Sequence, residues 1–132
     1  MRILQINKFY FINGGTARYY FEVSDLLKKY NHKIGYFSMY DPKNYKTKWD
    51  KYFVSNISYE KVSINDSIRK FVHMIYSIEA KKKLSHLLDV FTPDVVHLHS
   101  IYHHISPSII IELKKRNIPI DIIICFFNPF IC

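Results

Sequence analysis

The chain has 132 residues, of which 48% are hydrophobic and 17% aromatic, a composition that excludes a disordered chain and suits one domain over residues 1–132. Its formal net charge is +8, which favours either anionic partners or simply a solvated basic surface. No stretch approaches the roughly 18 apolar residues of a membrane-spanning helix. The amino-terminal residues lack the long apolar region of a signal peptide, so we expect a cytoplasmic location.

Short apolar runs alternate with an amphipathic segment in the first part of the chain. Residues 2–7 are typical of a buried strand. From Gly15 to Tyr30, apolar positions recur every three or four residues, which predicts a helix. Residues 33–39 predict a second strand, the polar stretch 40–50 predicts a loop, and residues 51–55 could add a small strand.

A long helix is predicted from residue 65 to residue 90. Asn65 or Asp66 could cap it, and a break near Ser77 would divide it into two helices. Its helical spacing places several apolar residues on one face: Ile68, Phe71, Val72, Ile75 and Ile78.

The remaining elements continue the alternation. Residues 92–99 predict a third strand. A helix follows, with Ser106 as its N-cap and Pro107 at its first position. Residues 118–126 predict a fourth strand, after which the sequence stops at Cys132.

This order of elements predicts the fold class α/β, a Rossmann-like parallel sheet with helices on both faces. The strands are apolar runs, as expected when both faces of a sheet are covered. Ligands of such sheets gather at the carboxyl ends of the strands. A complete doubly wound domain would continue beyond a fourth strand, so we expect a truncated domain or one part of a larger enzyme.

Gly14 and Gly15 lie between the first strand and the first helix. Glycines there let the backbone approach a ligand, and the amino end of the helix offers N–H groups to a phosphate or a sugar oxygen. The segment is neither a G-x-G-x-x-G fingerprint nor a P-loop. A plain tight turn is the alternative interpretation.

The segment HLHSIYHH, residues 97–104, holds four of the seven histidines. His97 and His99 point to the same side of a strand. An H-x-H pair can bind zinc, but a third ligand would have to come from His103, His104 or Asp94. We therefore favour a ligand pocket and expect no metal.

No residue pattern identifies catalytic residues, which stay unknown. Cys125 could be a nucleophile at the end of the fourth strand, but it is better interpreted as a small buried hydrophobic residue. Neither Cys125 nor Cys132 belongs to a zinc-type spacing.

Three segments together carry a recognisable signature: MRILQINKFYFINGGTARYYFEVSDLLKKYNHKIGYFSMYDPKN, YFVSNI and PDVVHLHSIYHHISPSIIIELKKRNIPI. They resemble the amino-terminal part of family 4 glycosyltransferases with the GT-B fold, up to about Ile120. Enzymes of this family assemble bacterial capsule, exopolysaccharide and lipopolysaccharide chains.

The resemblance implies two Rossmann-like domains that face each other across a cleft, of which this chain would be the acceptor-side one. Gly14, Gly15 and Arg18 would then lie near the phosphates of a nucleotide-sugar donor. The acceptor side of the cleft would be lined by His97, His99, Tyr102, His103 and His104. Transfer in this fold needs no metal or other cofactor.

Two departures from the family pattern matter. Cys125-Phe126 stand where a His-Asp pair is expected, which is compatible with a frameshift. The donor-binding domain is not part of the sequence. We therefore expect a chain without turnover of its own, which would need a separate chain that carries the carboxyl-terminal domain.

Two alternatives stay open: a non-catalytic binding or interaction module, and the remnant of a disrupted gene. Nucleic acid is not an expected partner, because no RNA- or DNA-binding motif accompanies the positive charge. The expected partners are a nucleotide-sugar and a saccharide or lipid-linked acceptor. A lipid-linked acceptor would be compatible with peripheral contact at the inner face of the membrane.

Overall fold

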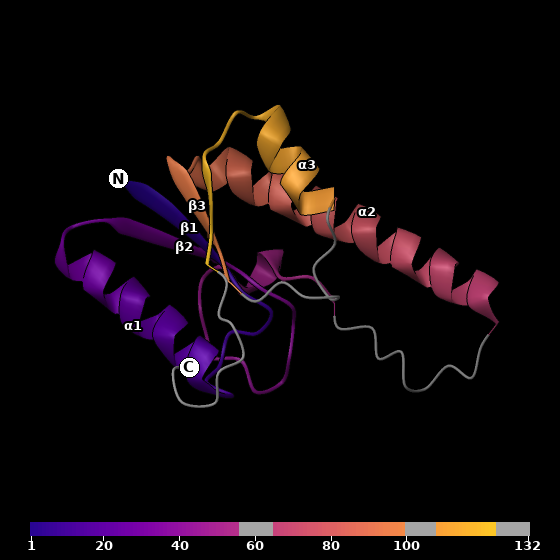
Figure 1. The fold of residues 1–132 in the computed structure, drawn as a ribbon, viewed down its shortest axis with the longest axis horizontal. Helices are drawn as coiled ribbons and strands as arrows, with labels where there is room; N and C mark the ends of the chain where they lie inside the picture. The colour runs from indigo at the N-terminus through magenta and orange to yellow at the C-terminus, as the bar shows by residue number, and fades with distance from the viewer. Residues whose placement is uncertain (56–64, 100–107, 124–132) are drawn as a thin grey trace.

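A computed structural model describes residues 1–55, 65–99 and 108–123 (Figure 1). Its four strands form one parallel sheet in the order β2-β1-β3-β4. The elements are, in chain order, β1 Arg2–Ile6, α1 Gly15–Lys29, β2 Lys33–Phe37, the 3-10 helix η1 Asp50–Tyr52, α2 Asp66–Phe91, β3 Val95–Leu98, α3 Ser108–Lys115 and β4 Ile120–Ile122.

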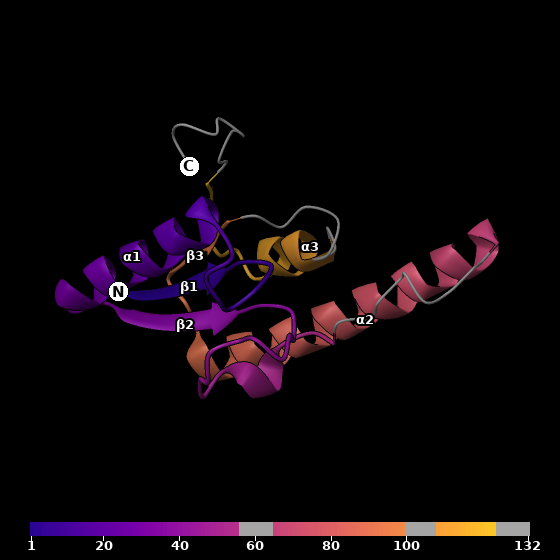
Figure 2. The ribbon, with the colours of Figure 1, turned by 90° about the horizontal axis from the view of Figure 1, so that it is seen from below.

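The helices cover both faces of the sheet. Helix α1 lies on one face, and α2 and α3 lie on the other (Figure 2). The predicted α/β class, a Rossmann-like parallel sheet with helices on both faces, is confirmed. The chain first moves from β1 outward to β2, then crosses back past β1 to β3, so the direction of winding reverses between β1 and β3. That reversal is the place where open α/β sheets bind ligands.

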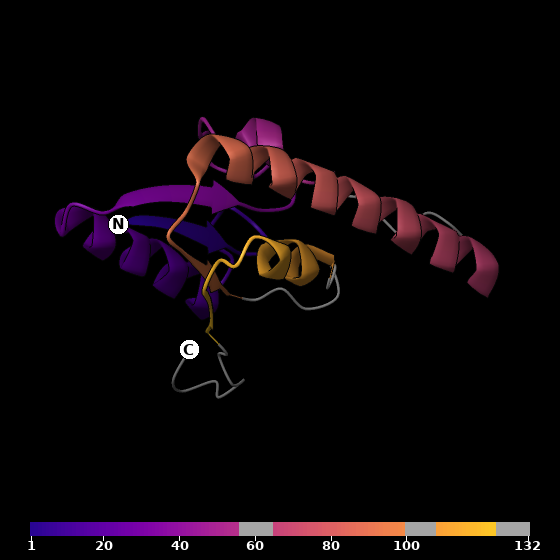
Figure 3. The same ribbon diagram turned by 90° about the horizontal axis from the view of Figure 1, so that it is seen from above.

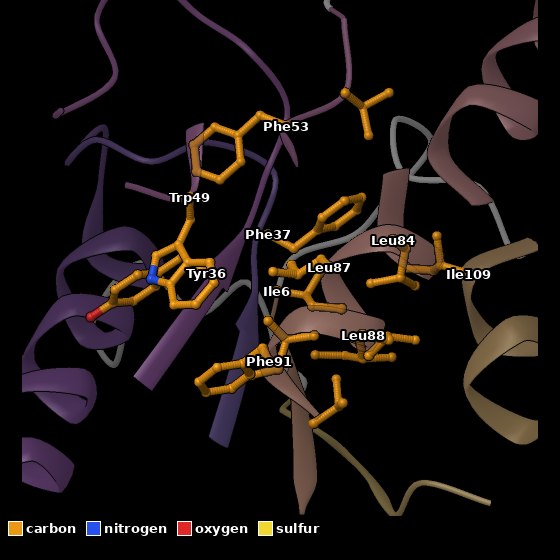
Figure 4. Close-up of a cluster of buried hydrophobic side chains, with 14 of the residues drawn as sticks. Ile6, Tyr36, Phe37, Trp49, Phe53, Leu84, Leu87, Leu88, Phe91 and Ile109 are labelled. Atoms are coloured by element: carbon orange, nitrogen blue, oxygen red, sulfur yellow. The ribbon is translucent and has the colours of Figure 1, made fainter. Parts of the chain in front are cut away.

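The core lies mainly between the sheet and the second half of α2 (Figure 4). Leu84, Leu87 and Leu88 are buried against Ile6 and other residues of the same cluster. Burial of each such side chain contributes on the order of 1.5–3 kcal/mol. Because helices cover the sheet on both sides, the middle strands β1 and β3 are largely buried on both faces.

Gly35 in β2 is required by this packing. A Cβ atom at that position would lie 3.0 Å from two atoms of the Phe91 ring, at the end of α2. Such a contact is closer than van der Waals packing allows, so the glycine lets the ring sit directly on the strand.

Two details differ from the sequence-based expectations. Residues 51–55 form no full strand; they contain the end of η1 and a single parallel bridge from Val54 to Met39. Helix α2 continues through Ser77 without a break. Asn65 is its N-cap, but the side chain makes no capping hydrogen bond. The predicted cap at Ser106 and Pro107 lies outside the described residues.

The apolar face predicted for α2 is not the face that the core buries. Five apolar side chains in the first half of the helix are exposed, and we call them the α2 stripe: Ile68, Phe71, Met74, Ile75 and Ile78. The core instead takes up residues of the second half: Ala80, Leu84, Leu87, Leu88 and Phe91. The spacing therefore identified the helix, and four of the five residues predicted to share a face belong to the exposed stripe, while the side chain of the fifth, Val72, lies outside the described residues.

Candidate functional site

Polar side chains form a row across the sheet on the side of α1. Gln5 of β1 is level with Tyr36 of β2 and with His97 of β3, and His97 is level with Asp121 of β4. The ring of Tyr20, from α1, packs 5.9 Å from that of Tyr36, which places the row on the face that α1 covers. Polar groups thus interrupt an otherwise apolar sheet at the point where winding reverses.

A second row follows two residues further along the same strands, and hence on the same face. It contains Ser38, Asn7 and His99, all buried. The backbone N–H of Asn7 donates to Phe37 and that of His99 donates to Ile6, so the parallel ladder continues through this row. The rings of Tyr20 and His99 meet edge to face, with centroids 5.0 Å apart.

The side-chain amide of Gln5 joins the two histidines. Its nitrogen donates to Nδ1 of His97 over 3.3 Å, and its oxygen accepts a hydrogen bond from Nε2 of His99. An amide nitrogen can only donate and an amide oxygen can only accept, so both contacts fix tautomers. His97 carries its proton on Nε2, and His99 presents the lone pair of Nδ1.

Both imidazoles are held neutral. Burial lowers the pKa of His99 to about 4, the charge of His97 acts in the same direction, and Asp121 opposes them. Burial likewise lowers the pKa of His97, again against the effect of Asp121. At neutral pH the pair therefore offers hydrogen-bond donors and acceptors without positive charge.

Within the part of the chain that the structure describes, four buried side-chain atoms make no hydrogen bond of ordinary geometry: Asn7 Oδ1, Tyr20 Oη, Ser38 Oγ and His99 Nδ1, although the hydroxyls of Tyr20 and Ser38 interact with each other. All four belong to the second row or to the α1 residue above it. Buried polar atoms without partners are rare in folded proteins, because each costs about 1–3 kcal/mol. Their concentration at one place marks a site built for more than packing.

The glycine turn lies at the amino end of α1. Gly14 is the N-cap and Gly15 the first helical residue. A Cβ atom at Gly14 would meet nothing within 4 Å, so the described residues leave this turn open rather than crowded. The backbone N–H of Arg18 bonds to the carbonyl of Gly14, and its side chain is exposed. The free N–H groups at this end suit an anion or a sugar oxygen.

Of the histidine cluster, the structure places His97 and His99. His97 is half-buried, and His99 is buried below Tyr19 and Tyr20. Tyr102, His103 and His104 lie outside the described residues, as do Cys125 and Cys132. Gln5 and Asn7 were not singled out from the sequence, although two polar residues at alternate positions of a buried strand are the signal that could have identified them.

Asp94 was wrong as a candidate zinc ligand. It precedes β3 at the amino edge of the sheet, whereas His97 and His99 stand at or after the carboxyl end. Its carboxylate accepts from the backbone N–H of Arg2 over 2.7 Å and pairs with the guanidinium of Arg2 over 3.4 Å. Among the described residues there is no group of three His, Cys, Asp or Glu that could hold a metal ion.

No protein-family model matches the chain, and no curated protein or solved structure is significantly similar to it. Among the described residues, no helix combines the length and the apolar character needed to cross a bilayer.

Proposed function

We propose that this chain is the acceptor-side domain of a glycosyltransferase that moves a sugar from a nucleotide-sugar donor to a saccharide or lipid-linked acceptor. One observation carries the proposal. Gln5 joins the neutral imidazoles of His97 and His99 where the sheet reverses its winding. The resemblance to family 4 glycosyltransferases adds the reaction class.

The chemistry of this site suits neutral hydroxyl groups. Because His97 uses Nδ1 to accept from Gln5, its Nε2–H is left as a donor at the half-buried end of the row. Asp121, level with it on β4, is exposed and offers carboxylate acceptors. A donor beside an acceptor matches a sugar hydroxyl, which both gives and takes a hydrogen bond.

The glycine turn at the amino end of α1 suits the phosphates of the donor. Gly14 is exposed at the amino end of α1, and Arg18 is exposed on the first turn of the same helix. Helix dipole, free N–H groups and guanidinium together favour a phosphate. A donor diphosphate on this side and an acceptor near His97 would bring the two reactants together, which is the main contribution of such a domain to catalysis.

Titration of the isotope-labelled protein, followed by NMR, tests the two binding roles. Nucleoside diphosphates should shift the amide signals of Gly14 and Gly15, and saccharides should shift those near His97. Half a cleft binds weakly, so the titration should extend to about 10 mM. His97→Phe should abolish the saccharide response, whereas His32→Phe, at the opposite end of the sheet, should preserve it. Unchanged spectra with every ligand would rule out the assignment.

A transfer assay tests whether this chain needs a second chain for sugar transfer. The purified protein should show no sugar transfer from common nucleotide-sugars, because one side of a cleft cannot hold donor and acceptor together in the geometry that transfer requires. Turnover by this chain alone would contradict the proposal that it supplies only the acceptor side.

A further inference from the structure

The first half of α2 presents an apolar surface to solvent. All five side chains of the α2 stripe are between 44% and 60% exposed. This half of the helix extends beyond the sheet and beyond α3 (Figure 1, Figure 3). A contiguous run of exposed large apolar side chains marks an interaction site far more often than does one isolated residue.

The stripe is not an unfinished part of the core. At 3.6 residues per turn, it is centred about 160° around the helix from the face that the second half buries. Toward the core side, the first half instead carries Asp66 and Lys70. Extending the domain's own core along α2 would therefore leave the stripe uncovered, which indicates a separate partner.

The stripe is also confined to the first half of the helix. On the same side, the second half continues with Lys82, Ser85 and Asp89. Asp89 pairs with Arg116 of α3, and Ser85 bonds to the same guanidinium, so this polar continuation belongs to the domain's own surface. The apolar surface thus ends where the helix meets the rest of the protein.

A basic pocket of about 450 Å³ lies next to the carboxyl end of the stripe, between η1 and α2. We use this name for the space lined by Lys51, Tyr52, Glu79, Lys82, Lys83 and His86. Three lysines face one carboxylate there. Glu79 is paired with Lys83 at 3.1 Å and accepts a hydrogen bond from the hydroxyl of Ser55 at 2.7 Å. Lys51 and Lys82 make no ion pair with the described residues, so the pocket attracts anions.

The charges around the stripe decide between partners. Lys82 stands one helical turn from Ile78 on the side of the stripe, and Lys51 lines the basic pocket beside it. A second copy of the chain, packed stripe to stripe, would bring these like charges together at a cost. A partner that is apolar inside and negatively charged at its surface would match both the apolar stripe and the lysines beside it. A helix that projects from the protein can lie along a flat layer, which a recessed groove could not do.

We propose that the first half of α2 is an interfacial helix that docks the protein on an anionic lipid bilayer, with the α2 stripe among the acyl chains and Lys51 and Lys82 on the lipid phosphates. Helices of this kind combine an apolar face with basic residues and lie in the plane of the interface. The proposal concerns the sheet face opposite the polar rows and does not depend on the transfer reaction.

Sedimentation with lipid vesicles tests this proposal. The protein should bind vesicles of phosphatidylcholine with about 30 mol% phosphatidylglycerol and bind pure phosphatidylcholine much less. Phe71→Ser with Ile75→Ser should weaken binding by about tenfold or more, because it removes apolar side chains from the buried face. Both residues are exposed, so the thermal unfolding of the variant should match that of the wild type.

Two matched controls separate the surface from general effects. Val90→Ser removes an exposed apolar side chain from the last turn of the same helix and should leave binding unchanged. Lys51→Gln with Lys82→Gln should weaken binding and its salt dependence, whereas Lys114→Gln with Lys115→Gln, on α3, removes the same charge and should have less effect.

Three outcomes would overturn the proposal. The first is a wild-type protein that ignores anionic vesicles. The second is a stripe variant that binds them as well as Val90→Ser does. The third is a wild-type dimer in sedimentation velocity that the stripe variant converts to a monomer without any vesicle binding, which would assign the stripe to a second copy of the chain.

Discussion

His99 donates a hydrogen bond from Nε2 to the side-chain oxygen of Gln5, a residue 94 positions earlier in the chain. This contact joins the end of β3 to the middle of β1 beneath α1. Because the same amide also donates to His97, one side chain sets the tautomers of both histidines. The hydrogen-bonding character of the site is therefore set from the first strand, outside the histidine cluster itself.

Replacing Gln5 by methionine should destabilise the fold. The substitution nearly preserves side-chain length but leaves Nε2–H of the buried His99 without an acceptor. An unpaired buried donor costs about 1–3 kcal/mol. Urea denaturation measures the difference, and Lys33→Met, an exposed change on β2, is the control for methionine itself. Equal stability of Gln5→Met and the wild type would show that the amide does not hold the histidines.

The sequence allowed the order of the elements to be predicted because that order depends on local patterns. Apolar runs mark β1, β2 and β3, and helical spacing marks α1. The polar rows depend instead on which strands become neighbours. Gln5 and His97 are level only because β3 pairs with β1. That pairing is decided by the tertiary arrangement of the strands and not by the residues next to Gln5 or His97 in the sequence.

The same limit applies to the apolar face of α2. Helical periodicity reports that apolar residues share a face, and it does so for Ile68 and Ile75. It does not report whether anything covers that face. The buried face was decided by the position of the sheet, against which only the second half of the helix packs (Figure 4).

Acid should destabilise the protein through His99. In the unfolded chain its pKa returns to about 6.5, whereas burial holds it to about 4 in the fold. Between these values the unfolded state binds more protons, so stability is complete above about pH 6.5 and falls as the pH drops towards 4. The loss is at most about 3 kcal/mol. The lowered pKa of His97 adds a loss of the same sign.

Chemical denaturation at pH 7 and at about pH 4.5 measures this dependence. His99→Gln should be less stable than the wild type at pH 7 but should lose less stability on acidification. His86→Gln, an exposed change on α2, should retain the wild-type dependence. An unaltered pH dependence in His99→Gln would assign the acid sensitivity to other groups.

Gly35→Ala should be strongly destabilising because the added methyl group would press on the ring of Phe91. The new Cβ would lie 3.0 Å from Cδ1 and Cε1 of Phe91. Relief of such overpacking costs about 1–3 kcal/mol. Combining Gly35→Ala with Phe91→Leu removes the ring, so the penalty of the glycine change should be smaller in that background. Equal penalties in both backgrounds, measured by urea denaturation, would exclude the ring as the cause.

Arg116, which follows the two lysines at the end of α3, holds α3 against α2. Its guanidinium donates to Asp89 over 2.7 Å and to the hydroxyl of Ser85 over 2.7 Å, both on α2, and to Glu112 of α3 over 3.2 Å. The planar fork can serve all three partners at once, which a lysine ammonium cannot do in the same geometry.

Arg116→Lys should therefore lower stability while it preserves charge. The loss of two hydrogen bonds to a half-buried group costs on the order of 1–2 kcal/mol. For a domain of this size, each kcal/mol corresponds to a fall in melting temperature of about 4 °C. Lys115→Arg, at an exposed neighbouring position, is the matched control and should have no such effect. In a double-mutant cycle, Ser85→Ala should cost less in the Arg116→Lys background than in the wild type. Additive effects would mean that the guanidinium and Ser85 do not act as a pair.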